Sequence, residues 1–118
     1  MGTESEDVGL RQEKTAWVFT LPPRLDAAVE DSLSPAVDRA LAAPPRLLVL
    51  DFTRVVNAGS AGIGAIVDTL RRASARGATV VLACLRGQPR LVLERIGLTS
   101  HIKVYDSVEE AMAGGNPA

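Results

Sequence analysis

The stretch from Leu47 to Arg76 constrains the fold of this chain more than any other. It opens with the apolar run LLVL, which ends at Asp51, crosses the small-residue segment NAGSAGIG, and continues with apolar residues spaced i, i+3, i+4 and i+7. A short apolar run between chain breakers is typical of a strand buried on both faces, and the later spacing is typical of a helix. The stretch therefore predicts a strand at Leu47–Asp51 and a helix from Ala61 to about Arg76. The turn between them would present free backbone N–H groups and the hydroxyl of Ser60.

Strand and helix patterns alternate along the rest of the chain. Two strands, at 8–12 and 16–21, predict a hairpin, and the prolines at 22 and 23 end it because proline cannot donate to a strand ladder. The remaining predicted elements are a helical region from about 28 to 42, a strand at 78–85, a helix at 87–96, a strand at 101–105 and a helix at 108–113. This ββαβαβαβα order predicts an α/β domain with a mixed, mostly parallel sheet of about four or five strands covered by about four helices.

Pro35 interrupts the first helical region and leaves two structures open. One is a continuous helix with Pro35 on its outer face, and the other is a turn followed by a helix that Ser34 caps and Pro35 begins. At 118 residues the chain is long enough for one apolar core. We expect a single domain at residues 8–113, with disordered tails at 1–7 and 114–118.

Composition excludes several classes of function. A net charge of −1 gives no electrostatic reason to expect nucleic acid binding. The longest apolar run is far shorter than a membrane span, and the N-terminus lacks a signal-peptide pattern, so we expect no membrane insertion and a cytoplasmic location. One cysteine, Cys84, and one histidine, His101, provide neither the ligand set of a metal site nor a nucleophile with its base. We therefore expect no enzyme activity, no metal and no cofactor.

The turn before the second predicted helix allows three interpretations. Small-residue turns at helix starts can hold a phosphate, which suggests a small-ligand or nucleotide binder, but the segment matches neither the P-loop nor the dinucleotide fingerprint. Ser60 could instead be the helix N-cap, with its oxygen accepting from the N–H of Gly62 or Ile63. Ser60 could also be a phosphorylation switch, because a phosphate there faces the positive end of the helix dipole and leaves the fold intact.

Five segments resemble a known family. The sequence LDFTRV followed by SAGIG resembles the "D-L-S-x-V … D-S-S-G-L-G" signature of STAS domains, in particular bacterial anti-sigma factor antagonists. Upstream, LPPRLD at 21–26 is similar to the family's "L-x-G-E-L-D". Downstream, LERIGL at 93–98 and IKVYDSVEEA at 102–111 are similar to its closing motifs. The family's acidic residue before the serine is Gly59 here, and its second hydroxyl residue is Ala61.

The resemblance implies a function. Ser60 matches the serine that an anti-sigma factor kinase phosphorylates, so the chain is expected to bind an anti-sigma factor/serine kinase, to be switched off by phosphorylation at Ser60, and to be restored by a serine phosphatase. The alternative is a STAS adaptor, not phosphorylated, in a transporter or sensor complex. The predicted partner-binding residues are Arg24, Asp26, Asn57, Ala58, Gly59, Ser60, Ala61, Gly62 and Ile63.

Overall fold

The fold is organised by a five-stranded sheet with the order β1-β2-β4-β6-β7, seen in a computed structural model that describes residues 7–115. β1 (Gly9–Gln12) pairs antiparallel with β2 (Trp17–Thr20), which confirms the predicted hairpin. β2, β4 (Leu47–Asp51), β6 (Thr79–Ala83) and β7 (Val104–Tyr105) then pair in parallel. The predicted α/β architecture and its mixed, mostly parallel sheet are confirmed.

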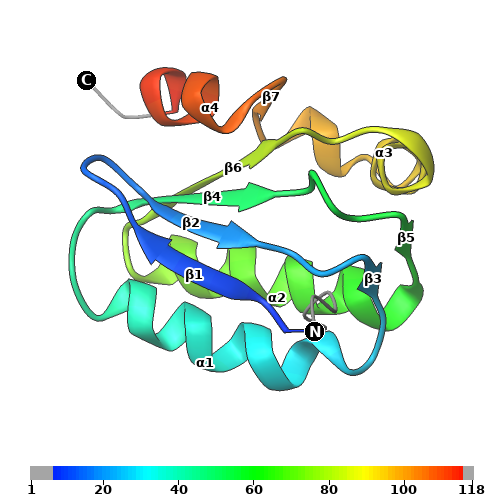
Figure 1. Cartoon of the computed structure of the whole chain (residues 1–118), viewed down its shortest axis with the longest axis horizontal. Helices are drawn as coiled ribbons and strands as arrows, with labels where there is room; N and C mark the ends of the chain where they lie inside the picture. The colour runs from blue at the N-terminus through cyan, green and yellow to red at the C-terminus, as the bar shows by residue number, and fades with distance from the viewer. Residues whose placement is uncertain (1–6, 116–118) are drawn as a thin grey trace, which may run out of the picture.

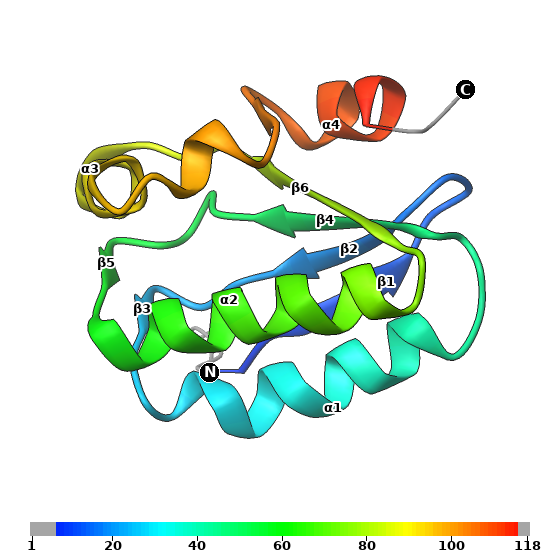
Figure 2. The same ribbon diagram turned by 180° about the vertical axis from the view of Figure 1, so that it is seen from behind.

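Helices cover both faces of the sheet (Figure 1). α1 (Val29–Leu41) and α2 (Ser60–Ala75) lie side by side on one face, as Figure 2 shows from behind. α4 (Val108–Gly114) packs on the opposite face. α3 (Gly87–Arg95) lies beyond the carboxyl ends of the strands and is followed by a 3₁₀ turn, η1 (Leu98–Ser100).

The central strand β4 is buried at every position because both of its faces are covered. Leu48 and Leu50 belong to the core beneath α1 and α2, whereas Leu47 and Val49 belong to the second core beneath α4. Alternation of side chains along a strand divides these four residues between the two cores. The continuous apolar run that predicted a doubly covered strand therefore has a direct physical origin.

Several predicted boundaries were wrong. β6 ends at Ala83, since Cys84 has a φ of 62° and leaves the extended region. β7 contains only residues 104 and 105, because the predicted strand's first residue, His101, caps the end of η1 and the chain bends at Ile102. α4 ends at Gly114, one residue past the predicted end of this helix at 113. Of the tails predicted at 1–7 and 114–118, residues 1–6 and 116–118 lie outside the described residues.

α1 is continuous through Pro35, which lies on its exposed side. The first of the two structures left open by the sequence is therefore the observed one. Ser34 does not cap this helix; its hydroxyl oxygen accepts a hydrogen bond from Arg72 of α2 at 3.2 Å. Proline inside a helix removes one backbone hydrogen bond and crowds the carbonyl one turn earlier.

Replacing Pro35 with alanine should stabilise the protein. Pro35→Ala restores an N–H that can bond to the carbonyl of Asp31, and we expect the free energy of unfolding to rise by about 2 kcal/mol after the entropy gained by the unfolded chain is subtracted. Urea denaturation measures this change. Pro89→Ala is the matched control, because Pro89 lies buried in the first turn of α3, where no intrahelical bond is missing, and this variant should gain nothing.

Candidate functional site

A two-stranded parallel ribbon lies against the start of α2. It pairs β3 (Arg24–Leu25) with β5 (Asn57–Ala58), which follow the carboxyl ends of β2 and β4. The register places Arg24 opposite Asn57 and Leu25 opposite Ala58. Both views show the ribbon beside the first turn of α2 and next to α3 (Figures 1 and 2). The sequence analysis did not predict this ribbon, because each of its strands is only two residues long.

The Leu25 carbonyl joins the ribbon to α2. Its oxygen accepts a hydrogen bond from the N–H of Gly59 at 2.9 Å. A Cβ atom at Gly62 would lie 2.1 Å from the same oxygen, far inside van der Waals contact. Only glycine at 62 therefore lets β3 pass this close to the first turn of the helix. The backbone on either side of Ser60 is fixed by these two contacts.

Ser60 is the first residue of α2, and its side chain is exposed. The N-cap is Gly59, with extended backbone angles (φ −100°, ψ 175°), so the interpretation of Ser60 as the helix cap is excluded, and the predicted helix start at Ala61 was wrong by one residue. Among residues 7–115, no side chain caps α2; the Ser60 hydroxyl is therefore not consumed in holding the helix. The first intrahelical hydrogen bond runs from Ile63 N–H to the Gly59 carbonyl at 2.9 Å, which leaves the N–H groups of residues 60–62 without helical acceptors.

The predicted partner-binding residues divide by exposure. Arg24, Asn57, Ser60 and Ala61 are exposed, and the ribbon and the helix start bring them to one end of the molecule. Asp26 is also exposed, and its carboxylate accepts a hydrogen bond from Ala28 N–H at 3.0 Å, at the entry to α1. The remaining predicted residues are less accessible. Gly59 and Ile63 are half-buried, and Ala58 and Gly62 are buried.

Gln88 on α3 holds the outer edge of β5. Its side-chain oxygen accepts from Ala58 N–H at 2.8 Å, and its side-chain nitrogen donates to the Ala58 carbonyl at 3.1 Å. The amide thus satisfies both backbone groups of Ala58, as a neighbouring strand would. The sequence analysis missed this residue. No local pattern connects positions 58 and 88, so no signal in the single sequence could have found it.

Asp51 stabilises the turn that leaves β4. Its carboxylate is buried and accepts two hydrogen bonds from Thr53, one from the backbone N–H at 3.0 Å and one from the hydroxyl at 2.6 Å. A short polar side chain that bonds to the backbone two residues later is a common way to fix a turn. Asp51 is therefore structural, and it sets the path of the chain toward β5.

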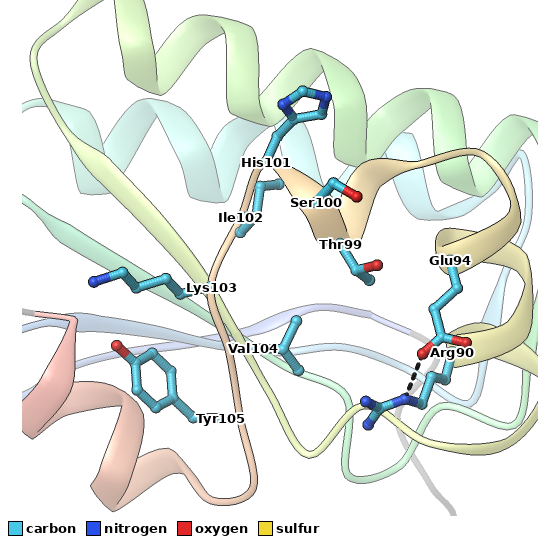
Figure 3. Close-up of a pocket in the computed structure, with 9 residues that line it drawn as sticks. All are labelled: Arg90, Glu94, Thr99, Ser100, His101, Ile102, Lys103, Val104 and Tyr105. Carbon is cyan, nitrogen blue, oxygen red and sulfur yellow. Dashed lines mark hydrogen bonds and ion pairs between the residues drawn. The ribbon is translucent and has the colours of Figure 1, made fainter.

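A hollow of about 630 Å³ lies along residues 99–105 and does not form a convergent site. Figure 3 shows Lys103 and Tyr105 pointing away from Arg90 and Glu94, which pair with each other at 2.9 Å. His101 projects in a third direction. Because these polar groups diverge, they cannot surround one reacting group or one anion.

Residues 7–115 contain no group of three or more His, Cys, Asp or Glu side chains placed to hold a metal ion. No helix in the same part of the chain has the length and apolarity needed to cross a bilayer.

The family profile of the STAS domain matches residues 8–111. The chain belongs to the STAS domain family. The sequence resemblance is thereby confirmed. A comparison with curated proteins found no significant match.

Three solved STAS-related structures illustrate the likeness in fold. An anti-sigma-factor antagonist (STAS) domain protein from Planctomyces limnophilus is 22% identical, with a TM-score of 0.73, over 92% of this chain and 96% of that chain. The Bacillus cell fate determinant SpoIIAA, in its phosphorylated form, is 19% identical, with a TM-score of 0.73, over 92% and 99%. A sulfate transporter family protein from Wolinella succinogenes is 20% identical, with a TM-score of 0.73, over 86% and 85%. At these identities the likeness establishes a shared fold.

Replacing each of two nearby glycines of the STAS domain with alanine should change the unfolding free energy in opposite directions. Gly62→Ala places a methyl group against the Leu25 carbonyl, and we expect a loss of about 2 kcal/mol or more in unfolding free energy. Gly64→Ala meets no atom within 4 Å and removes a flexible residue from the helix, so it should gain up to about 1 kcal/mol. Urea denaturation of both variants measures the difference. Equal effects would mean that β3 does not pass this close to α2.

Removing the Gln88 amide should loosen β5. Gln88→Leu keeps a similar volume but leaves the Ala58 N–H and carbonyl without their partners, at a cost of about 1–3 kcal/mol. Amide hydrogen exchange at Ala58 should accelerate more than exchange in β4. The control is Gln12→Leu, which removes one exposed hydrogen bond, to the Pro44 carbonyl at 3.1 Å. Unchanged exchange at Ala58 in Gln88→Leu would contradict the role assigned to Gln88.

Proposed function

We propose that this STAS domain is an anti-sigma factor antagonist that binds an anti-sigma factor/serine kinase and is switched off by phosphorylation of Ser60. The observation that carries the proposal is the position of Ser60. Its hydroxyl is exposed at the first residue of α2, and the side chain takes no part in capping that helix. Two of the proteins with this fold are an anti-sigma factor antagonist and a phosphorylated cell fate determinant, and both support the same assignment.

The chemistry of the switch follows from this position. The kinase would transfer the γ-phosphoryl group of ATP to the Ser60 oxygen, with release of ADP and of the hydroxyl proton. The product carries a charge of about −1.5 to −2 near the N–H groups of residues 60–62 and the positive end of the helix dipole. The fold therefore tolerates the added charge, and its effect falls on the bound partner. A serine phosphatase would reverse the step.

Gly59 leaves room for the carboxylate that the antagonist signature has at that position. Its φ of −100° suits any residue, and an added Cβ would make an ordinary contact of 3.7 Å with the Leu25 carbonyl. The absence of an acid at 59 is thus not imposed by the fold. We infer that the kinase of this antagonist obtains its contacts from other residues of the same surface.

The alternative function is an adaptor in a transporter or sensor complex that is not phosphorylated. Gly59 and Ala61 favour it, because they replace the acidic and hydroxyl residues that flank the serine in the antagonist signature. The sulfate transporter family protein from Wolinella succinogenes shares the fold. A transport protein that binds wild type and Ser60→Ala equally, without any kinase that modifies Ser60, would favour the adaptor.

Phosphorylation of Ser60 can be tested directly. The protein is incubated with ATP and with each kinase of the histidine-kinase-like ATPase superfamily encoded in its source genome, and modified sites are mapped by mass spectrometry. We expect phosphate on Ser60 with one such kinase and none in Ser60→Ala. Phosphate only at other residues would overturn the proposal.

A negative charge at position 60 should weaken partner binding without lowering the stability of the fold. Ser60→Asp should weaken binding to that kinase about tenfold or more, while the unfolding free energy stays unchanged or rises by a few tenths of a kcal/mol, because a carboxylate suits a helix N-terminus. Ser74→Asp is the matched control in the last turn of the same helix, where the residue is also exposed. It should bind normally and lose about 0.5 kcal/mol of stability. Isothermal titration and urea denaturation measure the two effects.

A further inference from the structure

A hollow of about 440 Å³ lies on the β3–β5 ribbon, whose second strand ends two residues before Ser60. Its walls come from both strands and the residues that precede them, namely Pro23, Arg24, Val56 and Asn57. Val56 is 70% exposed, the highest exposure among the large apolar side chains of residues 7–115. Together with Pro23, Val56 gives the hollow an apolar wall.

The backbone around Val56 is held in place. Its N–H donates to the Pro23 carbonyl at 2.7 Å, and the N–H of Asn57 donates to the same oxygen at 3.2 Å. Pro23 has a fixed φ, and Arg24 pairs in register with Asn57. The backbones of the two walls are therefore joined before any ligand arrives, and little backbone entropy remains to be lost on binding.

The charge of the hollow comes from Arg24. Within residues 7–115, its guanidinium forms no hydrogen bond or ion pair. The nearest acidic residue along the chain, Asp26, directs a carboxylate oxygen to the N–H of Ala28. The hollow thus combines an apolar wall with one unpaired cation, and this combination complements an apolar side chain next to a carboxylate.

We propose that this hollow receives a segment of a partner protein in which an aliphatic or aromatic side chain packs on Pro23 and Val56 and a neighbouring Asp or Glu pairs with Arg24. The proposal deepens the antagonist function and rests on it for the link to Ser60. A phosphoryl group on Ser60 has the same sign of charge as the partner's carboxylate. Phosphorylation would then weaken binding by repulsion across this surface, with no change in fold.

The peptide experiment tests the hollow without any kinase. The ¹⁵N-labelled full chain is titrated with the capped tripeptide acetyl-Glu-Leu-Glu-amide, and the amide shifts of residues 24, 56 and 57 are followed by NMR. We expect saturable shifts at these positions, at least threefold weaker affinity for acetyl-Gln-Leu-Gln-amide, and loss of saturation in Val56→Ser and Arg24→Glu. The absence of saturable shifts in the wild-type protein, or equal affinity for the two peptides, would overturn the proposal.

Two controls match the variants in chemistry. Ile96→Ser removes another exposed apolar side chain, 52% exposed, at the end of α3. Arg76→Glu makes the same change in charge at the opposite end of α2 from Ser60. Both should bind the peptide as the wild type does. A second copy of the chain is the competing occupant of the hollow, and sedimentation of the wild type and Val56→Ser tests it. A wild type that is dimeric and a variant that is monomeric would assign the hollow to self-association and overturn the proposal.

The same variants then separate this inference from the antagonist function. With the kinase that modifies Ser60, Arg24→Glu and Val56→Ser should each bind at least tenfold more weakly than Arg76→Glu and Ile96→Ser. A kinase that modifies Ser60 but binds all four variants equally would overturn the role of the hollow and leave the antagonist function standing. Failure of every kinase to modify Ser60 would overturn the antagonist function, and the peptide titration would still decide the hollow.

Discussion

The close approach of the Leu25 carbonyl to the first turn of α2 is the contact on which the candidate site depends. One oxygen accepts the N–H of Gly59 at 2.9 Å and occupies the space that a side chain at Gly62 would need. This contact joins the ribbon to the helix. Ser60 lies between the two glycines, so its position is set by backbone atoms. Its own side chain is left free for another purpose.

Two serines at helix starts show why that freedom matters. Ser107 is the N-cap of α4, and its hydroxyl oxygen accepts from Glu110 N–H at 3.0 Å. Ser60 occupies the next position along, inside α2, and Gly59 serves as the cap. A capping hydroxyl is worth about 1 kcal/mol to its helix, so its modification would act on the fold as well as on a partner. The one-residue offset at Ser60 separates these two effects.

Elements with a periodic apolar pattern were predictable from the sequence. Elements that depend on contacts between residues far apart in the chain were not. Leu47–Asp51 and the helix after it were predictable, because burial on both faces of a strand and on one face of a helix leaves a regular apolar pattern. The β3–β5 ribbon leaves no such pattern, because its two residues per strand are fixed by backbone bonds and by the space at Gly62. The Gln88 contact joins residues thirty positions apart, which no local window contains. The cap at Gly59 was missed because it depends on backbone angles, and a serine is the commoner cap.

These misses concentrate at the surface where a partner is proposed to dock, and there is a physical reason for this. A packed core must exclude water over many residues, and this requirement imposes periodic apolar patterns that the sequence displays. A docking surface needs only a few side chains held in place, and backbone bonds can hold them without constraining neighbouring residue types. Val56 and Arg24 are of this kind, since the Pro23 carbonyl and the strand register fix their positions while both side chains remain exposed. Such positions are free to change charge and size without loss of the fold. One STAS scaffold could therefore present differently charged surfaces beside the same serine, with each surface selecting its own partner.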